Sequence, residues 1–283
     1  MSDCDVRVET EDDRDAELAE QVEKIAAQVI PVLEDVTGLS VGEKPVIRIV
    51  TPAAWVTIRT EWRDRVHARL GQEFDLTDEE IQTLEIEAIS ESSELPLMWA
   101  LVMGSTHEDE SDEPQVLLVP SALHHCGFEE PELTKVAARE LTHIAQHRAG
   151  DGAAFRARNS VYRERIGLQD IQPDYLLSGH SRWTDLAVTK RLLGREVSED
   201  TGRQTEFWWS TAKAAAGRYQ ENPEKFPGKD LGVYRDGARW IADVVDLAGR
   251  DVLNRAWQDV SMIPTTAEIA DPRAWLARVD GTH

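Results

Sequence analysis

Residues 131–148 read PELTKVAARELTHIAQHR, and the interpretation of the whole chain depends on this stretch. With about 100° of rotation per helical residue, Val136, Leu141 and Ile144 fall on one face, which is therefore predicted to meet the core. Glu140 falls inside the same apolar arc. An ionised carboxylate is costly to bury without a partner. Glu140 is therefore expected to meet a cation, a metal, a hydrogen-bond donor or a water-filled cleft.

Two histidines continue this face, because His143 and His147 follow Glu140 on the same stripe of the predicted helix. They are four residues apart, so both could reach one metal ion from the helix. The same spacing is compatible with two ordinary half-buried histidines, and with Glu140 paired to a nearby arginine at the rim of the apolar face. Spacing alone leaves both interpretations open.

The local sequence also resembles a known family. Residues 139–143 (RELTH), followed by Gln146, resemble the HExxH motif of zinc metallopeptidases in the variant HELTHxxQ. Residues 178–185 (SGHSRWTD) are similar to the EGHAxWAD segment of a group of actinobacterial zincin-like proteins, and residues 116–125 look like that group's approach to the helix. The similarity runs over about residues 46–194 and implies a zincin-like fold.

Two substitutions separate the chain from this motif. Arg139 occupies the position of the motif's first histidine, and Ser178 that of the glutamate which the resemblance makes the third zinc ligand. Of the three ligands only His143 remains, and one imidazole does not hold zinc, because such sites need three or four donors. Arg139 is expected to neutralise a buried carboxylate, with Asp185 as one candidate. The leading hypothesis is a pseudo-peptidase without a cofactor, in which an internal ion pair replaces the metal and a cleft remains for binding.

Two other hypotheses stay open. His143, His147 and His180 could form a shifted zinc site with Glu140 as base, which would make the protein an active metal-dependent hydrolase. Alternatively, Glu140 and His143 could act as a metal-independent acid/base pair. The expected partner is a peptide, a protein or a small molecule in the cleft, and the sequence indicates no oligomeric state.

The remaining pattern predicts an α+β fold that is mainly helical, with a small antiparallel or mixed sheet. Residues 1–14 are expected to form a disordered acidic leader. Residues 15–283 are expected to form one zincin-like domain, with helices and the sheet in 15–130 and a helical half in 131–283.

Three strands are expected in the sheet. β-branched alternation predicts one over residues 44–51, and the apolar runs 97–103 and 115–120 are expected to pair as a hairpin with an acidic tip. Apolar periodicity predicts helices over residues 16–33, 52–70, 77–92, 131–148, 153–166, 171–193, 203–219, 231–247 and 251–260.

Composition limits the class of partner. The chain has 283 residues, with 53 Asp and Glu against 31 Lys and Arg and a formal net charge of -22. Because nucleic-acid binding needs clustered cations, no nucleic-acid partner is expected. No stretch approaches the ~20 apolar residues that span a bilayer, and residues 1–14 lack the apolar core of a signal peptide. Cys4 and Cys126 cannot form a disulfide framework. The sequence therefore predicts a cytoplasmic protein without membrane contact.

Overall fold

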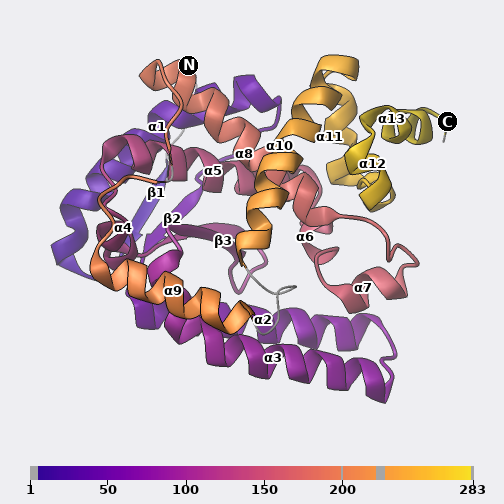
Figure 1. Cartoon of the computed structure of the whole chain (residues 1–283), viewed down its shortest axis with the longest axis horizontal. Helices are drawn as coiled ribbons and strands as arrows, with labels where there is room; N and C mark the ends of the chain where they lie inside the picture. Colours follow the sequence, from indigo (N-terminus) through magenta and orange to yellow (C-terminus); the bar gives the residue numbers. More distant parts are fainter. Residues whose placement is uncertain (1–5, 199, 221–226, 282–283) are drawn as a thin grey trace.

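The structure, a computed structural model, describes residues 6–198, 200–220 and 227–281. It is mainly helical with one small four-stranded mixed sheet, which confirms the expected fold class (Figure 1). The α-helices are α1 (Ala16–Thr37), α2 (Pro52–Glu73), α3 (Asp78–Met98), α4 (Pro120–Cys126), α5 (Glu130–Ala149), α6 (Ala153–Arg156), α7 (Ser160–Arg165), α8 (Pro173–Leu193), α9 (Glu206–Gln220), α10 (Pro227–Ala248), α11 (Arg250–Gln258), α12 (Thr266–Ala270) and α13 (Pro272–Asp280). None of these helices, over the described residues, is both long and apolar enough to cross a bilayer.

The sheet has the strand order β1-β2-β4-β3, with β1 (Arg7–Thr10), β2 (Val46–Ile49), β3 (Gly104–Glu108) and β4 (Pro114–Leu118). β1, β2 and β4 are parallel, and β3 is antiparallel to β4 and lies at one edge. The strand expected over residues 44–51 and the later strand of the hairpin are therefore present. The hairpin is antiparallel as predicted, and its acidic tip lies between β3 and β4.

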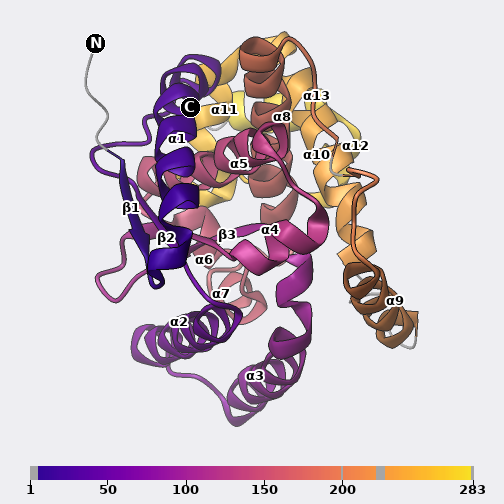
Figure 2. The same cartoon turned by 90° about the vertical axis from the view of Figure 1, so that its left-hand side faces the viewer.

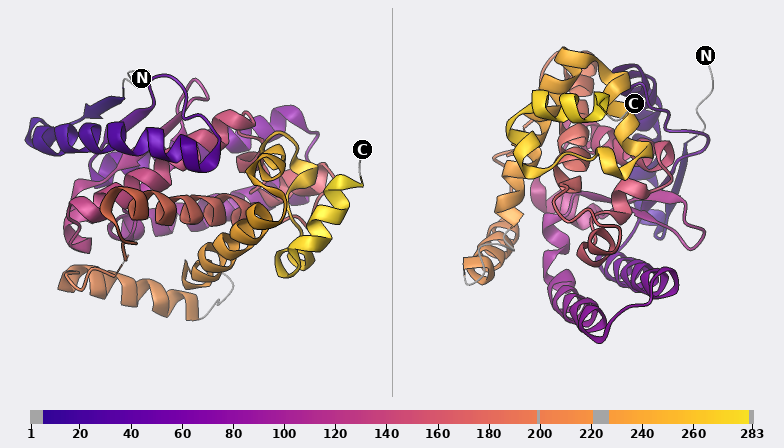
Figure 3. Two further views of the ribbon diagram at one scale, coloured as in Figure 1. Left: turned by 90° about the horizontal axis from the view of Figure 1, so that it is seen from above. Right: turned by 90° about the vertical axis from the view of Figure 1, so that its right-hand side faces the viewer.

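Helices cover both faces of the sheet (Figure 2). Ile47, Val116 and Leu118 pack on one face into the large core formed with α1, α5 and α8. Leu117 and Trp55 belong to a smaller apolar cluster on the opposite face, where α2 and α3 lie. Figure 3 shows α11, α12 and α13 gathered at the end of the molecule that is remote from α4. This arrangement places α5 at the centre, with the edge strand β3 beside it.

The prediction of a disordered acidic leader does not agree with β1. Residues 1–5 lie outside the described part of the chain, but Arg7–Thr10 form a strand that pairs with β2, with Arg7 opposite Val46. Val6 is buried. Because side chains alternate along a strand, two apolar valines suffice to bury one face of this stretch while its acidic residues stay outside. The disordered-leader prediction is therefore wrong for residues 7–10.

The prediction that residues 97–103 form the first strand of the hairpin is also wrong. α3 continues to Met98, and a 3-10 turn follows over Trp99–Leu101, so the apolar run 97–103 is not a strand. The strand is the polar segment Gly104–Glu108, which had been expected to be a loop. A short apolar run does not distinguish helix from strand. The side chains of β3 are polar and bond to α2 and α5. The segment therefore lacks the alternation of apolar and polar residues that predicts a strand.

The predicted helical half after residue 130 is present, with one interruption. The helix expected over 153–166 is divided into α6 and α7, because the Asn159 side chain accepts a hydrogen bond from the Tyr162 backbone and caps the start of α7. The short helices α4, α12 and α13 were not predicted. α4 and α12 have only seven and five residues, too few to give a clear helical period.

Candidate functional site

The candidate site is built on α5, the helix of the HExxH-like segment. α5 packs against α8, α1 and the strands β3 and β4, and it buries nearly all of its side chains. Glu140 is buried as the apolar arc predicted, Arg139 is buried beside it, and His143 is half-buried. The polar groups at the centre of α5 must therefore be bonded by neighbouring elements.

Arg139 forms the internal ion pair expected from the sequence. Its Nε and one terminal nitrogen lie 3.0 and 2.7 Å from Oδ2 of Asp185, which is fully buried on α8. Arg182 reaches the other Asp185 oxygen at 3.2 Å. Burial raises the pKa of Asp185, and the positive charges of Arg139, Lys135 and Arg182 oppose that rise. A cation thus occupies the position where the related motif has its first metal ligand.

Ser178, at the position of the motif's third ligand, lies near a tyrosine that the sequence did not single out. The Ser178 side chain lowers the pKa of Tyr234 of α10 slightly, and the Tyr234 ring lies 5.1 Å from the guanidinium carbon of Arg139. Burial raises the pKa of Tyr234, so the phenol stays neutral. α8 and α10 cross closely at Gly179, where a Cβ would lie 2.4 Å from the carbonyl carbon of Gly237. This close crossing brings the Tyr234 ring to α8. No motif in 231–247 pointed to Tyr234.

Glu140 is held by the edge strand. The Thr106 hydroxyl lies 2.8 Å from Oε2 of Glu140, to which it donates a hydrogen bond. Burial raises the pKa of Glu140 to about 7, against the effects of Thr106 and Arg139. Gly104 allows this close approach, since a Cβ there would lie 2.9 Å from Cγ of Glu140. At neutral pH the carboxyl group is therefore divided between its protonated and ionised forms.

Gln146 joins two histidines. Its amide nitrogen donates to the Leu177 carbonyl at 3.0 Å, which fixes the orientation of the amide. The same nitrogen lies 3.0 Å from His180 Nδ1, and the amide oxygen lies 2.7 Å from His143 Nδ1. His143 therefore carries its hydrogen on Nδ1, and His180 carries its hydrogen on Nε2. Burial lowers the pKa of His143 to about 4 and that of His180 to about 3, so both rings are neutral at pH 7.

These two depressed pKa values predict a loss of stability in mild acid. Below pH 6.5 the unfolded chain takes up protons at both histidines, whereas the folded chain does not until about pH 4 and about pH 3. For His180 alone, the free energy of unfolding should fall by about 2 kcal/mol between pH 7 and pH 5.

The variant His180→Asn should lack this part of the pH dependence, because its amide oxygen can accept from Gln146 in place of Nδ1. Urea denaturation at pH 5, 6 and 7 measures the difference. His124→Asn, at an exposed position, is the control and should keep the wild-type profile. Equal profiles for His180→Asn and the wild type would show that the buried ring is not neutral.

The shifted three-histidine site is not formed. His147 Nε2 lies 2.8 Å from Oε1 of Glu108, on β3, whereas His143 and His180 meet at Gln146. Among the described residues, no three His, Cys, Asp or Glu side chains are grouped so that they could hold a metal ion. His147 lies one turn further along α5 than His143, where the Glu108 carboxylate of β3 holds its ring. The residues present at Arg139, His143 and Ser178 do not fit zinc either.

The comparisons with known proteins give a family match and a fold match. A zincin-like metallopeptidase family model matches residues 188–276, from the end of α8 into α13. This region lies outside the motif on α5. The crystal structure of a protein from Chloroflexus aurantiacus, described as a proposed hydrolase with a novel fold, is similar with a TM-score of 0.57 and 14% identity, over 95% of this chain and 92% of that one. No curated protein matches the chain.

Proposed function

We propose that this chain is a zincin-like pseudo-peptidase, in which the ion pair between Arg139 and Asp185 takes the place of the metal site. In this proposal the protein acts by binding a peptide, a protein or a small molecule in the cleft beside α5, and it works in the cytoplasm. The observation that carries the proposal is the bond from Arg139 to the fully buried Asp185. The positive charge of the Arg139 guanidinium would repel a divalent metal ion at this position.

The surrounding contacts support the same proposal. His143, another position of the expected ligand set, is bonded to Gln146, and Arg139 is bonded to Asp185. These two positions therefore have protein partners without a metal. The match of residues 188–276 to the zincin-like family supports the inherited scaffold.

Metal binding tests the proposal. The wild-type protein, incubated with zinc and dialysed, is expected to hold far less than one zinc per chain by elemental analysis. The double variant Arg139→His/Ser178→Glu supplies two donors beside His143, and Asp185 can then accept a hydrogen bond from the new imidazole. This variant is expected to bind one zinc per chain.

The matched control is Arg139→Gln/Ser178→Glu, which removes the same cation but supplies no imidazole. Calorimetric titration with zinc should show tight binding only for the histidine variant. Stoichiometric zinc in the wild type would overturn the proposal. A folded histidine variant without zinc affinity would show that Arg139 and Ser178 do not stand at ligand positions.

A metal-independent acid/base enzyme is the second candidate. It is favoured by Glu140, whose pKa of about 7 suits proton transfer, and by the neutral His143 one turn away. The description of the Chloroflexus protein as a proposed hydrolase is compatible with it. Hydrolysis of 4-nitrophenyl esters that persists in EDTA and is lost in Glu140→Gln would favour this candidate over a binding protein.

A further inference from the structure

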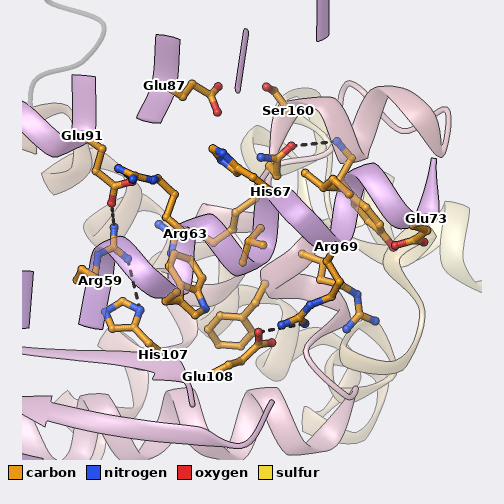
Figure 4. A pocket seen from close by; sticks show the side chains of 18 of the residues that line it. Arg59, Arg63, His67, Arg69, Glu73, Glu87, Glu91, His107, Glu108 and Ser160 are labelled. Atoms are coloured by element: carbon orange, nitrogen blue, oxygen red, sulfur yellow. Dashed lines mark hydrogen bonds and ion pairs between the residues drawn. The ribbon is translucent and has the colours of Figure 1, made fainter. Parts of the chain in front are cut away.

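A cavity of about 330 Å³ lies beside the candidate site, between α2, the edge strand β3 and residues 155–162 (Figure 4). It follows α2 from Arg59 to Glu73, a distance of about 20 Å at 1.5 Å per residue. Thr106 is part of its wall and is also the residue that bonds Glu140. Thr106 therefore lies between this cavity and the carboxyl group of Glu140 on α5.

One end of the cavity presents hydrogen-bond donors that have no acceptor. Arg59 approaches Nδ1 of the buried His107 at 3.4 Å, as Figure 4 shows. A guanidinium only donates, so Nδ1 accepts and Nε2 carries the hydrogen of the ring. His107 Nε2 and the indole nitrogen of Trp62 are buried without a hydrogen-bond partner in the described part of the chain, and the two rings lie 5.1 Å apart. Unpaired buried donors are rare and costly.

Two arginines, Arg59 and Arg158, lie near this end of the cavity. Burial, together with the charges of Arg59 and Arg158, holds the pKa of His107 well below its usual value. Glu91 is bonded to Arg59, and Asp174 to Arg158. These carboxylates hold the arginines in place.

The rest of the cavity has a different character. Trp62, Val66, Leu70 and Phe155 contribute apolar surface to its wall. At the far end Arg69 is bonded to Glu108 and Asp112, so its charge is balanced there. The cavity thus combines one donor-rich end with an apolar body.

We propose that this cavity binds a small organic carboxylate, whose two oxygens accept from His107, Trp62 and Arg59 while its apolar body packs against Val66, Leu70 and Phe155. A carboxylate is an acceptor-only group, so it satisfies the two orphaned donors and can also accept from the guanidinium of Arg59 beside them. This inference rests on the proposed function in one respect, namely that the cleft beside α5 is a binding site.

A matched pair of ligands tests the proposal. 4-Phenylbutyrate and its neutral analogue 4-phenylbutyramide have nearly the same shape and differ in charge. Calorimetric titration of the full chain should show that the acid binds at least about tenfold more tightly than the amide. Arg59→Met should reduce the affinity for the acid about tenfold and leave that for the amide within about twofold. Arg69→Met, at the far end from the orphaned donors, should change neither.

A second variant keeps the test decisive if Arg59→Met does not fold. His107→Phe preserves a ring beside Trp62 and removes the donor, and it should weaken binding of the acid more than binding of the amide, because a hydrogen bond to a charged acceptor is the stronger one. Equal affinities of acid and amide, wild-type affinity in both variants, or no binding of either probe at about 10 mM would overturn the proposal. Zinc content is measured separately, so a failure of the proposed function would be seen in the metal assay while the preference for the acid remained.

Discussion

Replacing Arg139 with methionine is expected to lower the free energy of unfolding by about 3–5 kcal/mol, because it leaves the carboxylate of Asp185 buried without its main partner. Urea denaturation at pH 7 measures the change. Arg182 makes one longer contact to the same carboxylate and is partly exposed. The matched variant Arg182→Met should therefore cost about 1 kcal/mol or less.

The double variant Arg139→Met/Asp185→Asn separates the ion pair from packing. If the loss in Arg139→Met comes from an uncompensated buried charge, neutralising Asp185 should restore most of it, with a coupling free energy of about 2 kcal/mol or more. If the loss of unfolding free energy in the double variant equals the sum of the losses in the two single variants, the ion pair is contradicted. Arg139 would then act through its packing on Tyr234.

Glu140→Gln is expected to stabilise the protein in alkaline solution and to have little effect in acid. Burial raises the pKa of Glu140 from its ordinary 4.5 to about 7. The folded state therefore favours the protonated form, so this group's contribution to stability is complete below pH 4.5 and is lost as the pH rises to about 7. Above pH 7 the ionised group costs about 3 kcal/mol.

Comparison of Glu140→Gln with the wild type at pH 4 and pH 8 measures this cost, since glutamine stays neutral and can still accept from Thr106. The variant should gain about 3 kcal/mol relative to the wild type between these two pH values. Glu108→Gln is a useful control: this carboxylate is paired with His147 and Arg69, and its pKa is lowered. Removing it should not give an alkaline gain. A constant difference between Glu140→Gln and the wild type would mean that Glu140 titrates normally.

The centre of the fold and the ion pair could be predicted from the sequence, for physical reasons that particular residues make clear. The apolar period of α5 is long enough to identify the helix and to place Glu140 on its buried face. An arginine at a buried ligand position favours a carboxylate partner, and Asp185 was the one candidate named from the sequence. Local patterns of this kind need no knowledge of other elements.

The groups that complete the site could not be predicted in the same way. Thr106 lies on a polar edge strand that has no apolar alternation, and Tyr234 reaches Ser178 only because α8 and α10 cross at Gly179 and Gly237. Gln146 was noticed as part of the motif, but its role depends on Leu177 and His180, more than thirty residues away. Such contacts depend on tertiary packing, and the periodicity of apolar residues along the sequence does not reveal them.

The strand at the beginning of the chain has a practical consequence for anyone who trims the protein to residue 15 before expression. β1 protects one edge of the sheet, and its removal would leave the backbone donors and acceptors of β2 bare. Naked strand edges recruit strands from other molecules. A shortened polypeptide would then tend to aggregate, which an experimenter could mistake for intrinsic instability of the helical body.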